Sequence, residues 1–157
     1  MNLKNYGFVK ISNKNEINTE MPEDIIETPV IDSIDIYTDG ACFNNGKSNA
    51  KAGIGVYIPQ YDIQISERIQ GKQSNNTAEI KALIKAIELV KNDAEDKKLI
   101  HIYSDSEYSI KCASSYGRKL EQSNWSLKDR RIPNLQLVKE LYYLYKPYKN
   151  IRLIHIR

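Results

Sequence analysis

Cysteine is scarce in this sequence, and long apolar runs are absent. Only two cysteines, Cys42 and Cys112, occur among 157 residues, too few for a disulfide framework. No group of histidines and cysteines has the spacing of a zinc site. The longest apolar runs are a few residues, so we expect no contact with a membrane. Two free thiols favour a reducing compartment, and we expect an intracellular protein of the cytoplasm or nucleus.

Glycine and proline are also few, with 7 and 5 residues, which excludes collagen-like and wholly disordered chains. The N-terminus lacks an apolar core with a small-residue cleavage site, so no secretory signal is expected. Residues 1–33 are rich in asparagine and glutamate and show no sustained periodicity. We therefore predict a flexible N-terminal extension over 1–33, followed by one domain over 34–157.

Charge is distributed unevenly along the chain. Residues 1–35 hold 3 basic and 7 acidic side chains, whereas residues 107–157 hold 11 basic and 4 acidic ones. One interpretation is a polyanionic partner that binds the last third, and the other is an ordinary solvated face.

Hydrophobic periodicity predicts a chain of strands and helices in the order β-β-β-α-β-α-α-β. Apolar residues at positions 80, 83, 84, 87 and 90 form one face of a helix, with Asn76 or Thr77 as the expected N-cap. Residues 92–98 and 115–132 are expected to be irregular. The fold class is α/β or α+β, with strands expected at 34–39, 53–58, 63–71, 99–105 and 151–156 and further helices at 106–114 and 134–146.

Three acidic residues stand at the ends of predicted elements. Asp39 closes a strand, Glu79 lies in the first turn of the first helix, and Asp105 closes another strand. If they converge, their carboxylates repel one another unless a cation shares them, and hard oxygen ligands suit Mg²⁺ or Mn²⁺. The alternative is that they are separate helix-capping and strand-end acids, and their spacing alone leaves both interpretations open.

Several motifs occur in order along the chain. The first includes Tyr37 to Cys42, the second runs from Gln73 to Ile80, the third from Tyr103 to Tyr108, and Asn124-Trp125 precedes Asn134. Together they resemble ribonuclease H of type 1, and the first hairpin is most similar to the eukaryotic branch. The resemblance implies a five-stranded mixed sheet, three antiparallel strands followed by two parallel ones, with packed helices.

The resemblance also implies an activity. Members of the family hydrolyse the RNA strand of RNA–DNA hybrids endonucleolytically, by divalent-metal-assisted attack of water. Mg²⁺ is the implied cofactor, with Mn²⁺ as an alternative, and the hybrid is the implied partner, while protein partners are not indicated. The implied catalytic residues and metal ligands are Asp39, Glu79 and Asp105.

Substrate-binding roles follow from the same resemblance. Asn45, Asn75 and Asn76 match residues that read the minor groove of the hybrid. Lys72, Ser74 and Asn134 match a pocket for a DNA phosphate. Trp125 matches an aromatic residue of the DNA-strand channel, although a core tryptophan is the alternative. The basic residues expected to line this channel are Arg118, Lys119, Lys128, Arg130 and Arg131.

The match to the family breaks after the fifth predicted strand. There the family continues with a histidine on a loop and a fourth catalytic aspartate on a C-terminal helix. We therefore expect a C-terminally truncated domain in which that helix is missing, as a fragment or as a natural short form. His155 is expected to be a strand residue, and the alternative is a shifted alignment in which it matches the family's histidine. His101 is likewise expected to be structural. The alternative function is a catalytically impaired module of the same fold that binds hybrids or a protein.

Overall fold

The computed structural model describes residues 32–157. The extension predicted over 1–33 lies outside the described residues, except for Asp32 and for Ser33, which already begins the first strand. Within residues 32–157, no helix is long and apolar enough to cross a lipid bilayer.

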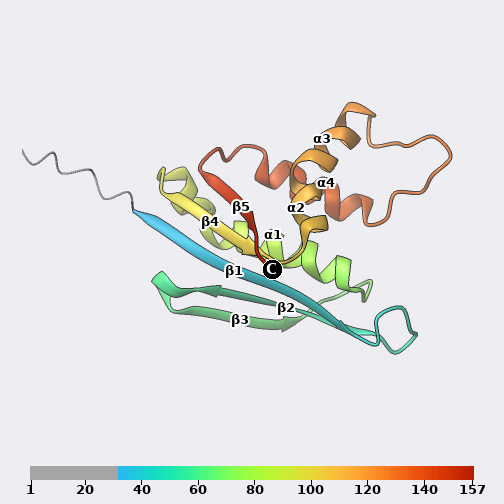
Figure 1. The fold of residues 1–157 in the computed structure, drawn as a ribbon, viewed down its shortest axis with the longest axis horizontal. Helices are drawn as coiled ribbons and strands as arrows, with labels where there is room; N and C mark the ends of the chain where they lie inside the picture. Colours follow the sequence, from blue (N-terminus) through green and yellow to red (C-terminus); the bar gives the residue numbers. More distant parts are fainter. Residues whose placement is uncertain (1–31) are drawn as a thin grey trace, which may run out of the picture. The chain divides into compact units, whose positions relative to one another are not determined.

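A five-stranded mixed sheet forms the centre of the domain (Figure 1). Its strand order is β3-β2-β1-β4-β5, in which β1, β2 and β3 pair antiparallel and β1, β4 and β5 pair parallel. The predicted mixed sheet is therefore confirmed. The strands are β1 (Ser33–Phe43), β2 (Lys51–Ile58), β3 (Ile63–Arg68), β4 (Leu99–Ser104) and β5 (Ile151–His155).

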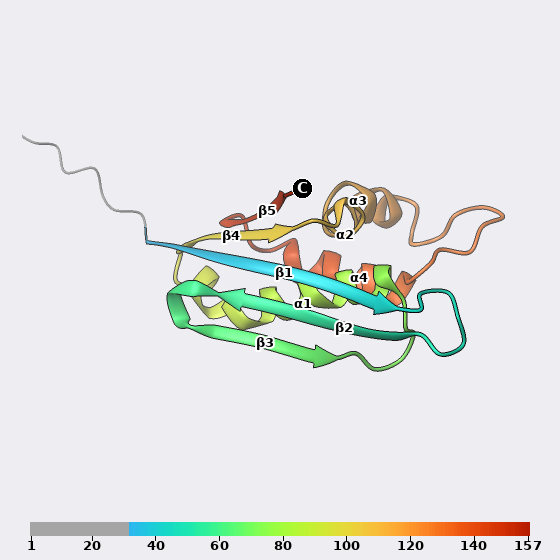
Figure 2. The same cartoon turned by 60° about the horizontal axis from the view of Figure 1, so that its bottom comes forward.

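Helices cover one face of this sheet. Figure 2 shows α1 and α4 behind the sheet, where α1 contacts β1 and β2 and α4 contacts α1. Along β1, the even-numbered residues from Ile34 to Gly40 are buried, whereas Tyr37 and Asp39 on the other face are exposed. The helices are α1 (Asn75–Glu95), α2 (Glu107–Ala113), α3 (Ser115–Gln122) and α4 (Leu135–Tyr145), and a 3-10 turn, η2 (Pro59–Tyr61), joins β2 to β3.

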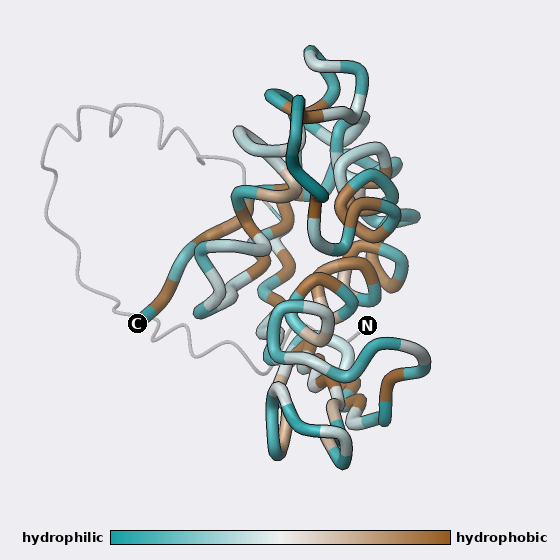
Figure 3. The backbone as a smooth tube through the Cα atoms, turned by 90° about the vertical axis from the view of Figure 1, so that its right-hand side faces the viewer, coloured by the Kyte–Doolittle hydropathy of each residue, from teal (hydrophilic) through white to brown (hydrophobic). Residues whose placement is uncertain are grey.

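The core lies between the sheet and α1. Ile80, Leu83 and Ile87 have no exposed surface, and they pack on Ile36 and Ile102 of the central strands. Each such side chain contributes about 2 kcal/mol when it leaves water. All five residues of the predicted apolar helix face are buried. Figure 3 shows the hydrophobic segments gathered in the middle of the domain.

The start of α1 differs from the prediction. Ser74, and neither Asn76 nor Thr77, is the N-cap, because its extended backbone leaves its hydroxyl free to accept the backbone N–H of Thr77. Glu79 is consequently the fifth residue of the helix and lies beyond its first turn. The run from Ser74 to Thr77 offers four residues that all cap helices well, so composition could not choose among them.

Two segments predicted to be irregular are partly helical. Residues 115–122 form α3, which has a single fully buried apolar side chain, Leu120. The hydrophobic periodicity of α3 is therefore too weak to be detected in the sequence, and tertiary packing stabilises this helix. Gly117 is required there, because a Cβ would lie 2.3 Å from the carbonyl oxygen of Cys112. Helix α1 also extends to Glu95, since Ala94 is still part of the core.

Gly40 sets the distance between β1 and α1. A Cβ atom at this position would lie 2.4 Å from the backbone nitrogen of Glu79 and 2.5 Å from the carbonyl carbon of Ala78. The strand and the helix backbone thus touch directly, with no room for a side chain. This contact brings Asp39 next to Glu79.

Replacing Gly40 by alanine is expected to destabilise the domain by about 2 kcal/mol or more, because two backbones must move apart. Urea unfolding of Gly40→Ala against the wild type measures the loss. Gly55→Ala is the matched control, since its Cβ would have 3.9 Å to the nearest atom. Equal stability of Gly40→Ala and Gly55→Ala would contradict the close approach.

Candidate active site

Three acidic residues come from three different elements. Asp105 was predicted to close its strand, but β4 ends at Ser104 and Asp105 directly follows it, while Glu79 projects from α1. Asp39 does not close β1, however. The strand continues to Phe43, because β1 and β2 remain paired from Asp39↔Gly55 to Phe43↔Lys51. Asp39 is thus a mid-strand residue on the exposed face of the sheet.

The three carboxylates converge. One oxygen of each of Asp39, Glu79 and Asp105 lies within 4.8 Å of the other two. Asp39 and Asp105 are exposed, whereas Glu79 is 8% exposed. The interpretation of three separate capping acids is therefore excluded by the geometry.

Six of the seven predicted substrate-binding residues also meet at one place. They line a cavity of about 270 Å³ between the β1–β2 turn, the start of α1 and the segment before α4. The six residues are Asn45, Lys72, Ser74, Asn75, Asn76 and Asn134.

Hydrogen bonds hold this cavity, here called the asparagine pocket, in shape. The side-chain oxygen of Asn45 accepts the backbone N–H of Asn75 at 3.2 Å, which ties the β1–β2 turn to α1. Asn134 has a left-handed backbone, and its side-chain oxygen accepts the hydroxyl of Thr77 at 3.0 Å. Sequence reasoning missed Thr77, which is buried and connects Ser74 with Asn134.

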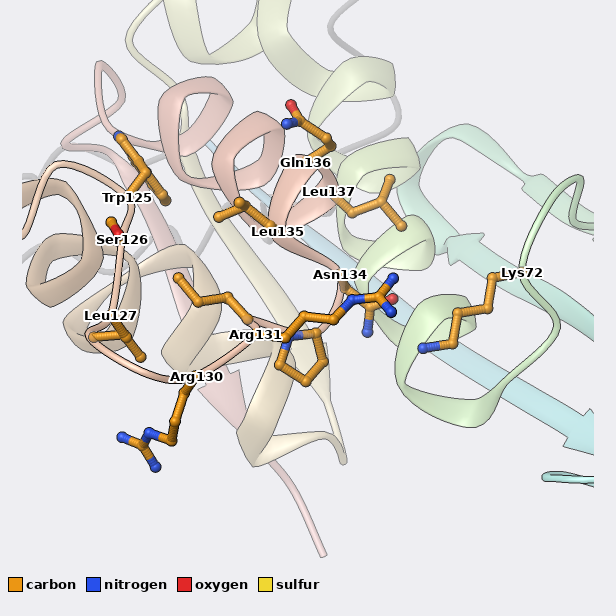
Figure 4. A pocket seen from close by; sticks show the side chains of 12 residues that line it. Lys72, Trp125, Ser126, Leu127, Arg130, Arg131, Asn134, Leu135, Gln136 and Leu137 are labelled. Atoms are coloured by element: carbon orange, nitrogen blue, oxygen red, sulfur yellow. The ribbon is translucent and has the colours of Figure 1, made fainter.

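A wider groove of about 900 Å³ adjoins this pocket and shares Lys72 and Asn134 with it. Lys72 lies at one end of the groove and Trp125 at the other, with Arg131 between them (Figure 4). Arg130 also lines the groove, whereas Arg118, Lys119 and Lys128 are exposed but do not line it. Trp125 is half-buried at the groove, so it is not a fully enclosed core residue.

Comparison with known proteins decides the family. The family model described as RNase H matches residues 32–157. The chain belongs to the RNase H family.

Relatives of this RNase H domain include proteins named ribonuclease H and ribonuclease H1. It is 36% identical over 95 residues to "Ribonuclease H1" of Rattus norvegicus, a match that covers 60% of the chain and 33% of the relative. It is 31% identical over 121 residues to "Ribonuclease H" of Caldanaerobacter subterraneus, covering 74% of the chain and 73% of the relative. The chain thus spans about a third of the length of the mammalian relatives it matches.

A solved structure supports the fold. LC9-RNase H1, described as a type 1 RNase H with the type 2 active-site motif, superposes with a TM-score of 0.62 and 19% identity. The match covers 80% of this chain and 63% of that one.

The two histidines of the chain have different surroundings in the RNase H domain. The Nδ1 atom of His101 lies 3.3 Å from Oδ1 of Asp35 on the exposed face of the sheet. His101 pairs with Asp35 of β1 and not with Asp39, so it lies away from the three acids. His155 is a strand residue, as predicted, although β5 ends there and not at Ile156. Its Nε2 lies 3.0 Å from the carbonyl oxygen of Asp105. The parallel register Ser104↔His155 explains this proximity, which strand assignment alone does not reveal.

The environment of Glu79 is suited to a cation. Burial, together with the charges of Asp105 and Asp39, raises the pKa of Glu79 from 4.5 to about 7. A hydrogen bond from the Gly40 backbone lowers this pKa and offsets part of the increase. The Oε2 atom of Glu79 is the one buried side-chain oxygen or nitrogen in residues 32–157 without a hydrogen-bond partner. RNases H depend on divalent metal ions, and three carboxylates with an unpaired buried oxygen fit that requirement.

The raised pKa of Glu79 predicts that the folded domain loses stability as the pH increases. The unfolded chain ionises this group near its usual 4.5, whereas the folded chain holds the proton to about 7. Protonated Glu79 therefore contributes its full stabilisation below a pH of about 4.5, and this stabilisation is lost as the pH rises to about 7. Glutamine at this position does not ionise. Without divalent ions, the free energy of unfolding of Glu79→Gln relative to that of the wild type should therefore increase by about 2 kcal/mol from about pH 5 to about pH 8.

Urea unfolding in EDTA at both pH values tests this difference. Glu88→Gln is the control, because Glu88 is exposed on the same helix. If the difference in unfolding free energy between Glu79→Gln and the wild type does not increase with pH, the coupling of the three acids is contradicted.

Proposed function

We propose that this chain is a metal-dependent endonuclease that hydrolyses the RNA strand of RNA–DNA hybrids. The observation that carries the proposal is the cluster of Asp39, Glu79 and Asp105, whose oxygens lie within 4.8 Å of one another in a domain of the RNase H family. The names of its relatives, ribonuclease H and ribonuclease H1, support the same activity.

Asp39, Glu79 and Asp105 would hold Mg²⁺, with Mn²⁺ as the alternative. Such an ion supplies positive charge that activates water and stabilises the leaving oxygen of a phosphodiester. Ionised Glu79 would compensate this charge in a buried position, where the carboxylate otherwise keeps its proton up to a pH of about 7. Asp39 and Asp105 are exposed and hold the open side of the cluster, where a phosphodiester can approach.

The asparagine pocket is suited to a hybrid. Asn45, Asn75 and Asn76 carry amides that both donate and accept hydrogen bonds, as 2′-hydroxyls and base edges of a minor groove require. Lys72, with Ser74 and Asn134, offers a cation and polar groups to a phosphate of the DNA strand. We propose these roles for the six residues, and a channel for the DNA strand along the groove toward Trp125.

The two cysteines support an intracellular site of action. Cys42 and Cys112 are both free thiols, and free thiols are typical of proteins in a reducing compartment.

Replacing Asp39 by asparagine should lower cleavage of the RNA strand by about 100-fold or more, because the charge that attracts the cation falls. The measurement is the initial rate on an end-labelled RNA–DNA hybrid in Mg²⁺ and in Mn²⁺. Asp35→Asn is the matched control, since Asp35 lies on the same face of the same strand, next to His101.

Three outcomes are informative. Cleavage of the hybrid but not of duplex DNA, lost in Asp39→Asn and kept in Asp35→Asn, supports the proposed nuclease. Salt-sensitive hybrid binding without cleavage in either metal would favour the hybrid-binding module instead. Cleavage that survives in Asp39→Asn would refute the role of the acid cluster.

Replacing Lys72 by methionine should weaken hybrid binding about equally for all sequences and reduce the salt slope of log K by about 1, because one phosphate contact is lost. Fluorescence anisotropy of a labelled hybrid at several salt concentrations measures both quantities. Lys91→Met removes an exposed lysine of α1 outside the groove and serves as the control. An unchanged slope in Lys72→Met would contradict the phosphate contact.

A further inference from the structure

Trp125 is held in an uncommon backbone conformation at the end of the groove. It is the only tryptophan of the chain. Asn124 and Trp125 are consecutive left-handed residues, with φ of 56° and 58°. Asparagine tolerates this conformation, whereas a bulky residue adopts it only where its surroundings enforce it. The backbone N–H of Trp125 donates to the carbonyl of Leu120 at 2.7 Å, which fixes the end of α3.

Helix α4 holds the indole ring from the other side. The indole N–H donates to the hydroxyl of Tyr143 at 3.2 Å, and the two ring centroids are 5.6 Å apart. Tyr142 packs edge-on against the same ring at 5.7 Å. The ammonium group of Lys139 lies over the indole, 5.6 Å from its centroid. The orientation of the ring is thus set by three side chains of one helix.

The two tyrosines serve different purposes. Tyr142 is buried, and its hydroxyl donates to Glu121 at 2.5 Å, so it ties α4 to α3. Lys146 adds a second link to the same carboxylate at 2.9 Å. Tyr143 is 44% exposed and contributes little to the core. Its hydroxyl oxygen accepts the hydrogen bond from the indole N–H.

We propose that Tyr143 is a positioning residue, which holds the Trp125 indole in the orientation that contacts a nucleic-acid strand in the groove. This inference rests on the proposed function and deepens it. A ring that is fixed before binding loses less conformational freedom when a strand packs on it. Stacking of a base or sugar on an aromatic ring is favourable for any sequence, as are phosphate contacts along the groove. Lys139, above the same ring, adds positive charge at this end of the groove.

Tyr143→Phe tests the proposal, because it removes the hydroxyl and keeps the ring. We expect hybrid affinity to fall about 3- to 10-fold, as for the loss of one hydrogen bond, with kcat at saturating hybrid unchanged. Since Trp125 is the only fluorophore of its kind, acrylamide quenching of its emission should increase in the free protein. Tyr148→Phe is the matched control, whose hydroxyl bonds to Glu95 outside the groove.

A double-mutant cycle separates positioning from general packing. In a Trp125→Phe background, Tyr143→Phe should have no further effect on hybrid affinity, because no indole remains to be held. Additive losses, or equal affinity and quenching of Tyr143→Phe and the wild type, would overturn the positioning role. A wild-type protein that does not bind the hybrid at all would instead overturn the proposed function.

Discussion

The close contact between Gly40 and the backbone of α1 is the constraint on which the site depends. Because no side chain separates the strand from the helix at this point, the carboxylate of Glu79 is buried beside Asp39 and Asp105. Three acids in one place repel one another, and the unpaired Oε2 of Glu79 adds a desolvation cost. The packing of the core enforces an arrangement that electrostatics alone would not allow, and a cation would relieve it.

The start of α1 links catalysis to substrate recognition. Ser74, Asn75 and Asn76 line the asparagine pocket, and Glu79 joins the acid cluster less than two helical turns later. The distance and angle from Asn75 and Asn76 to Glu79 are therefore set by helix geometry. Asn45 and Asn134 attach the β1–β2 turn and the segment before α4 to this same helix end.

Much of the fold could be predicted from the sequence because the strongest signals are periodic. The apolar face of α1 and the alternation along β1 both follow from burial on one side. The prediction failed where local sequence carries little information: Ser74 competes with three other capping residues, and α3 has one fully buried apolar side chain. The convergence of the acids could not be derived from spacing, since it depends on pairing between strands distant in sequence. The hydrogen bond from Trp125 to Tyr143 is likewise a tertiary contact, between the loop after α3 and helix α4, and no sequence motif predicts it.

The ionisation of Glu79 tests the electrostatic basis of the site most directly. The chemical shift of its side-chain carboxyl carbon, followed by ¹³C NMR as a function of pH, reports the pKa of this one group. We predict a pKa of about 7 in EDTA and a marked decrease when Mg²⁺ is added, because the cation favours the ionised form. A pKa near the usual 4.5 in EDTA that Mg²⁺ leaves unchanged would contradict a buried acid cluster that holds a divalent ion.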